Sequence, residues 1–531
     1  MNSLKQSISH INPAHIIAAA SLIVIFAATS FYYTNGYIDI GNDKYHIFMK
    51  TAPVAVIAWV LLRTGLYLTD KGSQSISKII GGFGAADWFM IMMIGVSVIS
   101  TLTSKFKQTA VWGQEGWNMG LIVWLLMTGM YLMARDTARS ASSKFIRGVF
   151  HVFLVISALV FILGTINRYS IYPIHMMGEA EDFISTIGNI NWFCGYWCVW
   201  FGLGLGAFLT AEKPLQKVMY GLYLWICAMA GVSCGSSSCY LAFLAVSFTG
   251  LMWALEDIDR LASLCLAQII MFSALPGIRL IGWARPYRMW YDSELLRQLT
   301  YGDTWIAPWV GSVVVFGVMY DICLKYSTKK LTKTPEGRDK NNRIKKAFNR
   351  IRDIVIGVSC GGAAALILVI FLNSVVEGGI WPVRGMGIFT WGIRWGNGRG
   401  GIWIATMKII GTMLPLKIFF GVGPDCFCTY AYSMTDMAIL LNRYIGNQYL
   451  TCAHNELLTV LVNTGIFGAI AYAGTVISHI RSGIRTKVNI GLLLGMSAYI
   501  AVGMVGFAQI LSTPWFFVVM GAVAGLYRKG H

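Results

Sequence analysis

Apolar stretches long enough to cross a membrane recur along the 531-residue chain. A helix needs about 17 to 25 mostly apolar residues to span the hydrocarbon core of a bilayer. Such stretches lie at residues 16–33, 51–69, 87–104, 118–134, 148–166, 191–209, 219–234, 237–255, 262–281, 305–324, 353–373, 456–478, 489–508 and 511–527. Only 12% of the residues are charged, about half the share in a soluble protein. The sequence therefore predicts an all-α polytopic membrane protein with about 14 transmembrane helices.

The basic residues give the predicted helices an orientation. Cytoplasmic loops of membrane proteins collect Lys and Arg. With the N-terminus inside and the spans alternating, 26 of the 42 basic residues lie on the cytoplasmic side, including 11 in residues 325–352. We therefore expect both termini in the cytoplasm. The net charge of +18 follows from this topology and from attraction to anionic lipid, so it requires no nucleic acid partner.

Loop length divides the chain into two parts. Residues 1–352 form a predicted N-terminal transmembrane bundle that ends in the basic cytoplasmic loop 325–352. Residues 353–531 form a C-terminal part in which one large exported loop, 374–455, precedes the last three helices. Loops this long are usually functional. Within the loop, the semi-apolar stretch 401–420 contains Pro415 and two lysines, and we expect it to lie at the membrane surface or to pack on the bundle.

Side chains suited to a binding site gather in this exported loop and at its end. They are Glu377, Arg384, Arg394, Arg399, Asp425, His454, Asn455 and Glu456. An arginine guanidinium is always charged and grips phosphate oxygens through two parallel hydrogen bonds. Exported loops normally avoid basic residues, whereas this loop holds six, four arginines and two lysines. The arginines therefore indicate either phosphate binding or simple loop solubility.

His454 stands directly before the predicted helix 456–478. A histidine at a helix entrance is most often a hydrogen-bonded interfacial residue, but imidazole is also the side chain most readily used as a general base near neutral pH. Asn455 and Glu456 could orient His454 or a substrate, and the free N–H groups at the helix start favour anions. Gly465 and Gly468 lie three apart on one face of the predicted helix and are small enough for a neighbouring helix to approach closely.

Three ordered motifs surround these residues. They are NGRGGIW at 397–403, FFGVGPDCF at 419–427 and AHNELLTVLVNTGIFG at 453–468. In this order, ahead of the last few helices, they resemble the signature of the O-antigen ligase family and the related O-antigen or capsule polymerases, which belong to the glycosyltransferase C superfamily. The multi-spanning frame extends the resemblance, more loosely, to most of the chain.

The resemblance implies an activity and assigns roles. It implies transfer of a glycan from an undecaprenyl diphosphate carrier to an acceptor hydroxyl on the outer face, with inversion and without metal or cofactor. His454 matches the histidine that assists the acceptor hydroxyl, and Arg399 matches the loop arginine that contacts the diphosphate. We therefore expect His454 and Arg399 to be catalytic. The expected substrate-binding residues are Arg384, Arg394, Gly421, Gly423, Asp425, Asn455 and Glu456.

One segment departs from the family pattern. Ligases often carry Ser-Arg-Gly near the outer end of a middle helix, where this chain has CGSSSCYLAF at 234–243. A second diphosphate contact must then come from elsewhere, for instance Arg384, Arg394 or the arginines of 279–290. Glu377 or Asp425 could replace His454 as the base. The missing arginine favours a polymerase over a lipopolysaccharide ligase.

The predicted function is polymerisation of surface polysaccharide repeat units in the bacterial cytoplasmic membrane, with the active site on the exported face. Its partners would be a lipid-linked oligosaccharide donor, a glycan or envelope acceptor, and membrane lipid. An O-antigen-type ligase is the alternative within this class. A lipid-linked glycan flippase or other transporter is the alternative from another class, and it would need ionisable residues deep inside spans. The clearest candidates, Arg63 and Asp321, lie near cytoplasmic helix ends, where snorkelling explains them. A non-catalytic membrane scaffold is a third alternative, and it would not need arginines and a histidine assembled on the exported face. The exported thiols of Cys426, Cys428 and Cys452 could be free or form a disulfide.

Overall fold

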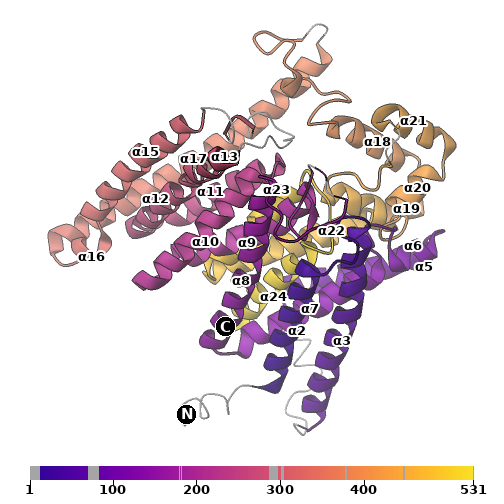
Figure 1. The fold of residues 1–531 in the computed structure, drawn as a ribbon, viewed down its shortest axis with the longest axis horizontal. Coiled ribbons are helices and arrows are strands. Elements are labelled where there is room, and N and C mark those ends of the chain that lie inside the picture. The colour runs from indigo at the N-terminus through magenta and orange to yellow at the C-terminus, as the bar shows by residue number, and fades with distance from the viewer. Residues whose placement is uncertain are drawn as a thin grey trace.

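The computed structural model shows an almost entirely helical protein (Figure 1). It describes residues 12–69, 83–178, 180, 182–285, 297–299, 304–376, 379–446 and 449–529. Within this part of the chain the only strands are β1 (Phe183–Ile184) and β2 (Gly188–Asn189), which pair antiparallel just before a central helix. The all-α fold class is therefore confirmed.

The helices follow one another with short connections through most of the chain. Up to residue 331 they are α2 (Pro13–Phe31), α3 (Ile40–Thr69), α5 (Ala85–Thr103), α6 (Lys107–Trp112), α7 (Leu121–Ser140), α8 (Ser143–Asn167), α9 (Ile190–Leu209), α10 (Pro214–Ser233), α11 (Ser238–Ala254), α12 (Ile258–Phe272), α13 (Ala274–Ala284), α15 (Ile306–Lys325) and α16 (Thr328–Leu331). Beyond it they are α17 (Pro335–Val375), the 3-10 turn η1 (Gly387–Phe389), α18 (Arg399–Gly411), α19 (Pro415–Phe420), α20 (Phe427–Tyr432), α21 (Thr435–Ile445), α22 (Glu456–Arg485), α23 (Ile490–Gly503) and α24 (Thr513–Lys529).

Every predicted span coincides with a helix. In the described part of the chain, ten helices, with α12 and α13 counted as one, are long and apolar enough to cross a membrane. Three more, α11, α23 and α24, are apolar but shorter, and a helix rises only about 1.5 Å per residue. Helix α7 carries Arg135, Asp136 and Arg139 in its last turns. By helix length and hydropathy the chain is a multi-pass membrane protein, and fourteen crossings stays a prediction.

Local sequence signals set several helix starts. The side chain of Asn12 accepts a hydrogen bond from the Ala14 N–H at 2.9 Å, and Pro13 takes the first helical position of α2. Thr334 and Pro335 begin α17 in the same way. A polar cap satisfies an N–H group that the first turn leaves unpaired, and proline lacks that N–H altogether.

Two predicted loops contain more helix than expected. The basic segment 325–352 is mostly helical, because α17 begins at Pro335 and runs without a break into the predicted span 353–373. The exported loop 374–455 contains α18 to α21. Its semi-apolar stretch forms α18 and α19, and Pro415 starts the second of these helices. Helices α18, α20 and α21 share a small core, formed by Ala405, Ile409, Phe427, Ala431 and Leu441 together with Val462 of α22 and others, and α19 packs against it through the partly buried Ile418.

Helix α9 lies at the centre of the transmembrane bundle and is buried over almost its whole length. It packs against α23 where glycine faces glycine: Gly202 meets Gly495, and Gly206 meets Gly491. Small residues let two helix backbones approach closely in a membrane, where van der Waals packing drives association. This contact fixes α23 along the C-terminal half of α9, and the loop that follows α23 lies beside the N-terminal end of α9, where Gln509 contacts Trp192 and Gly195.

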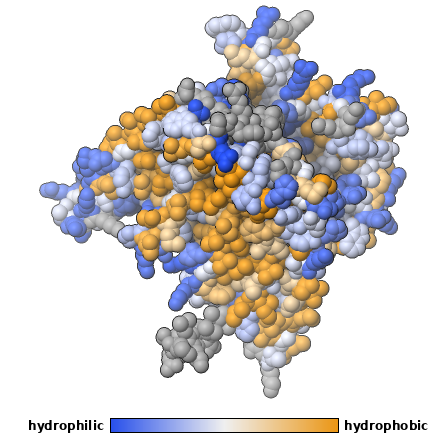
Figure 2. Space-filling view, in the orientation of Figure 1, coloured by the Kyte–Doolittle hydropathy of each residue, from blue (hydrophilic) through white to orange (hydrophobic). Residues whose placement is uncertain are grey.

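The surface has the pattern of a membrane protein. Figure 2 shows a broad hydrophobic area across the middle of this face, with hydrophilic side chains gathered toward its margins. The start of α2 and the end of α24 lie toward one end of the bundle, whereas α18 and α21 lie toward the other (Figure 1). This arrangement agrees with termini on one side of the membrane and the loop 374–455 on the opposite side.

Candidate functional site

Helix α22 is broken near its middle. At Gly465, φ is 70° and ψ is −171°, well outside the helical region. The extended segment after α19 pairs with the backbone beside this break. The Val422 N–H donates to the Val462 carbonyl at 3.1 Å, and the Gly423 N–H donates to the Asn463 carbonyl at 2.9 Å. These hydrogen bonds pair backbone carbonyls that the break leaves without helical partners, so they fasten the loop 374–455 to α22.

The expectation for Gly465 and Gly468 was therefore wrong in part. They do not form one flat face on a continuous helix, because Gly465 interrupts it. A Cβ atom at Gly465 would lie 2.3 Å from the carbonyl of Phe419. The close neighbour at this position is the end of the short helix α19, and not the face of another spanning helix.

The predicted site residues Gly421 and Gly423 have a structural role at this junction. Both have positive φ, 79° and 125° respectively, where a residue with a Cβ atom is strained. A Cβ atom on Gly421 would lie 2.2 Å from the Asn463 carbonyl oxygen. These glycines let the segment lie against the broken helix, and the residues after them, Pro424 and Asp425, line a cavity.

His454 lies in the loop that enters α22, with a positive φ of 45°. Its ring meets the ring of Phe507 edge to face, with 5.4 Å between centroids. Burial first, and then the positive charge of Arg399, lower the pKa of His454 to about 4. The imidazole is therefore neutral at pH 7 and can accept a proton or a hydrogen bond.

Arg399 is the first residue of α18, and backbone carbonyls hold its side chain. Its Nε donates to the Val505 carbonyl at 2.9 Å, and its Nη1 donates to the Gly396 carbonyl at 3.0 Å. Val505 belongs to the loop between α23 and α24, so the guanidinium bridges the exported loop and the C-terminal helices. These two hydrogen bonds to backbone carbonyls orient the guanidinium.

Arg399 and His454, predicted from motifs about fifty residues apart, line the same cavity of about 320 Å³. We call it the Arg399–His454 cavity. Its other lining residues are Asn191, Gly195, Ser238, Val502, Val505, Gly506, Phe507 and Gln509. The structure thus brings together the two side chains that the sequence analysis singled out as catalytic.

The polar residues Asn191, Ser238 and Gln509 were missed by the sequence analysis. Ser238 lies in the segment 234–243, which was noted only because it has no arginine. That segment does line the cavity, and there it contributes a hydroxyl group. Asn191 lies in the first turn of α9 and Gln509 lies in the loop before α24, and neither belongs to a motif, so only their spatial convergence identifies them.

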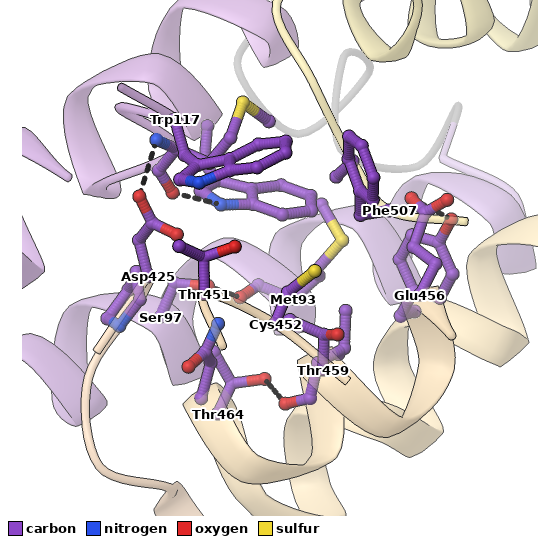
Figure 3. Close-up of a pocket in the computed structure, with 17 residues that line it drawn as sticks. Met93, Ser97, Trp117, Asp425, Thr451, Cys452, Glu456, Thr459, Thr464 and Phe507 are labelled. Carbon is purple, nitrogen blue, oxygen red and sulfur yellow. Dashed lines mark hydrogen bonds between the residues drawn. The ribbon is translucent and has the colours of Figure 1, made fainter. Parts of the chain in front are cut away.

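A larger cavity of about 620 Å³ lies on the other side of Phe507, which lines both. Its walls come from α5, from the segment between α6 and α7, and from α22. Figure 3 shows Asp425 and Glu456 toward opposite ends of this cavity, with Trp117 and Phe507 along one side. The rings of Trp117 and Phe507 pack edge to face, with centroids 4.3 Å apart. The Phe507 ring thus stands between Trp117 and His454.

Asp425 lines the larger cavity and secures its wall. Its Oδ2 accepts hydrogen bonds from the backbone N–H groups of Gln114 at 2.7 Å and Met119 at 2.8 Å. Burial raises the pKa of Asp425 to about 7, although these two hydrogen bonds act to lower it. Asp425 holds the segment between α6 and α7, and it is not among the residues that line the Arg399–His454 cavity.

Asn455 and Glu456 are buried in packing roles. The Asn455 Oδ1 caps α22 by accepting from the Leu458 N–H at 3.0 Å, and its Nδ2 donates to the Met504 carbonyl at 2.9 Å. The Glu456 Oε1 accepts from the hydroxyls of Tyr472 at 2.8 Å and Tyr499 at 3.0 Å. Asn455 therefore ties the His454 loop to the end of α23, while Glu456 joins the two halves of α22 and also lines the larger cavity.

The other expected arginines lie elsewhere. Arg384 and Arg394 are exposed on the exported loop, and neither is among the residues that line the two cavities. Glu377 and residues 286–290 lie outside the described residues. Cys426, Cys428 and Cys452 are buried free thiols. Among the residues that the structure describes, no group of three or more His, Cys, Asp or Glu side chains could hold a metal ion.

Comparison with known proteins gives no match to the chain, either among protein-family models or among curated proteins.

Proposed function

We propose that the protein is a membrane glycosyltransferase that moves a glycan from an undecaprenyl diphosphate carrier to an acceptor hydroxyl on the exported face. The observation that carries the proposal is the shared cavity of Arg399 and His454. It combines an oriented cation with a neutral imidazole, and it lies where the exported loop meets the bundle. The bacterial cytoplasmic membrane, with both termini inside, is the location that fits this orientation.

The proposed reaction is a single displacement at the anomeric carbon. The acceptor oxygen forms the new bond to that carbon while the bond to the diphosphate oxygen breaks. The electron pair of the breaking bond goes to the diphosphate, and the acceptor proton goes to His454. Negative charge grows on the leaving oxygen, and the guanidinium of Arg399 stabilises this charge more in the transition state than in the ground state. Inversion at the anomeric carbon follows from a single displacement.

The negative charge of the bound donor would also change the pKa of His454. In the free protein Arg399 is one cause of the low pKa of His454. A bound diphosphate brings negative charge beside the guanidinium, which offsets this effect and raises the pKa of the imidazole. A base with a higher pKa takes up a proton more readily, so donor binding would prepare His454 for its role.

This mechanism predicts an unusual pH dependence. Neutral His454 is the active form, so the rate falls when pH drops through the pKa of His454. We expect the acid limb of kcat/KM, which reports the free protein, near pH 4, and the limb of kcat at a higher pH. Steady-state rates between about pH 3 and 8, which cover both sides of the expected limb, check this. An acid limb of kcat/KM near 6.5, the ordinary pKa of histidine, would contradict the buried setting of the base.

The experiment that tests the function uses cells whose chromosomal copy carries His454→Ala. Loss of a general base lowers a rate by about 100- to 10,000-fold, so undecaprenyl-linked glycans should accumulate. Single repeat units on the outer face would indicate a polymerase, which we favour. Long carrier-bound chains on that face would indicate a ligase. A glycan profile identical to that of the parent cells would refute the proposed function.

A lipid-linked glycan flippase is the second candidate, and one observation favours it. His479 is fully buried within α22, where its Nδ1 lies 2.7 Å from the Thr475 carbonyl and its Nε2 lies 3.2 Å from the Tyr131 hydroxyl. Buried ionisable residues in spans often mark transport pathways. Arg63, in contrast, pairs with Asp136 at 2.7 Å, and Asp321 pairs with Lys325 at 2.6 Å on an exposed surface.

The cells that carry His454→Ala also distinguish a flippase from a glycosyltransferase. If His454→Ala impaired flipping, single repeat units would accumulate on the cytoplasmic face. Periodate oxidises sugar diols but does not cross an intact membrane. Repeat units that are oxidised in whole spheroplasts would therefore be exported, as the glycosyltransferase proposal predicts. Repeat units that are protected until the membrane is opened would support the flippase.

A further inference from the structure

Gln509 has a buried side-chain amide whose nitrogen is hydrogen-bonded and whose oxygen is unpaired. It lies in the loop between α23 and α24, and only 6% of it is exposed. Its backbone N–H donates to the Thr513 hydroxyl at 2.9 Å, and its Nε2 donates to the Trp192 carbonyl of α9 at 3.2 Å. A Cβ atom at Gly195 would lie 2.4 Å from this Nε2. Because Gly195 has no side chain, it leaves room for the amide nitrogen of Gln509.

The other end of the amide is an acceptor without a donor. A backbone carbonyl can only accept a hydrogen bond, so the amide nitrogen must face Trp192, and the oxygen Oε1 must point away from it. Within the described part of the chain, the buried Oε1 has no hydrogen-bond partner. Gln509 also lines the Arg399–His454 cavity. Buried polar groups are nearly always paired, so this oxygen is prepared for a donor that enters the cavity.

The chemistry of the cavity defines that donor. An amide oxygen repels a phosphate oxygen, and Arg399 provides the positive charge that phosphate requires. Gln509 instead requires an N–H or O–H group. A saccharide supplies hydroxyls, and an acceptor hydroxyl must lie close to His454 if His454 is to take its proton. The guanidinium and the amide oxygen therefore suit two different parts of the reacting pair.

We propose that Gln509 Oε1 accepts a hydrogen bond from a hydroxyl of the acceptor saccharide and thereby orients that saccharide toward His454. This inference rests on the proposed function and adds a specificity: the acceptor is a sugar with a second hydroxyl near the one that reacts. Gln509 binds and orients the acceptor, while Arg399 binds the diphosphate.

The test compares Gln509→Met, which keeps the length of the side chain but removes the amide, with the matched control Gln268→Met. Gln268 is also buried, but it lies in α12 and is not among the residues that line either cavity. Full-length proteins are placed in nanodiscs with lipid-linked saccharides extracted from the cells that make the protein. Glycan transfer and the affinity for undecaprenyl diphosphate are then measured separately.

We expect Gln509→Met to lower transfer by about 10- to 100-fold, because a misplaced reactant costs about this much. Its affinity for undecaprenyl diphosphate should match that of the parent protein, and Gln268→Met should change neither quantity. In a His454→Ala background the same substitution should cost no more than about threefold, because residues that act as one unit have non-additive effects. A merely structural role would lower transfer equally in both backgrounds.

The outcomes separate the two proposals. Equal losses of transfer and of undecaprenyl diphosphate affinity in Gln509→Met would overturn the role of Gln509 in orienting the acceptor, and so would unchanged transfer. In either case the proposed function would stand if Arg399→Ala still removed undecaprenyl diphosphate binding. A parent protein that neither binds this lipid nor transfers glycan would remove both proposals.

Discussion

Replacing Arg399 with alanine should lower the rate of glycan transfer by about 100- to 1,000-fold, which is the usual effect of removing a preorganised group that stabilises developing negative charge. The Arg399 guanidinium is held by the carbonyls of Val505 and Gly396 before any substrate arrives. It therefore does not need to reorganise as the diphosphate leaves. Because the leaving group is already good, we expect the loss to be at least as large as that from His454→Ala, which would then fall at the lower end of the range for a general base, about 100- to 1,000-fold. The measurement is glycan transfer by the full-length variant in nanodiscs.

Two further variants make the Arg399 result specific. Arg394→Ala removes an exposed arginine from the same loop and should change the rate by about twofold at most, as surface substitutions usually do. Arg399→Lys keeps the positive charge but loses the planar fork that grips two oxygens, so it should recover only part of the activity. Full activity in Arg399→Ala, or equal losses in Arg394→Ala and Arg399→Ala, would sink the assigned role.

The second large effect is expected for stability. Gly465→Ala should destabilise the protein by at least about 3 kcal/mol, because a backbone with φ of 70° and ψ of −171° is almost restricted to glycine. The added Cβ atom would also lie 2.3 Å from the backbone of Phe419. Either α22 straightens and releases the segment 421–424, or that segment moves away. We expect the melting temperature in detergent to fall by several degrees or more.

Gly362→Ala is the matched control for this substitution. Gly362 lies within α17, and a Cβ atom there would meet no other atom within 4 Å. Alanine favours a helix over glycine by roughly 1 kcal/mol, so the melting temperature should stay the same or rise slightly. If Gly465→Ala behaved like Gly362→Ala, α22 would not be broken in the membrane, and the pairing of Val422 and Gly423 with α22 would not exist.

Hydropathy predicted the helices well because a bilayer requires long apolar helices whatever their neighbours. All fourteen predicted stretches coincide with helices, although only ten of the described helices are long and apolar enough to span. The break at Gly465 was not predicted, since a glycine in an apolar run is equally compatible with a continuous helix. Its cause, the approach of Phe419 and the segment after it, is a tertiary contact.

The candidate site was predictable only where chemistry is concentrated in the sequence. Arg399 and His454 stand in motifs, and the structure places them in one cavity. Arg384 and Arg394 lie in the same loop, but both are exposed. The sequence could not predict this difference, because nothing in their local sequence distinguishes a buried arginine from a solvated one. Gln509 belongs to no sequence motif. Only the structure shows that the Trp192 carbonyl fixes the nitrogen of its amide.

The most direct test of the proposed activity is the release of undecaprenyl diphosphate by the purified protein. Full-length protein in nanodiscs is incubated with lipid-linked saccharides from its own cells, and the free carrier is measured by mass spectrometry. We predict that undecaprenyl diphosphate appears in step with each new glycosidic bond, and that Arg399→Ala releases almost none. Lipid-linked saccharide that stays intact with the parent protein, or that Arg399→Ala consumes equally fast, would contradict a glycosyltransferase centred on Arg399 and His454.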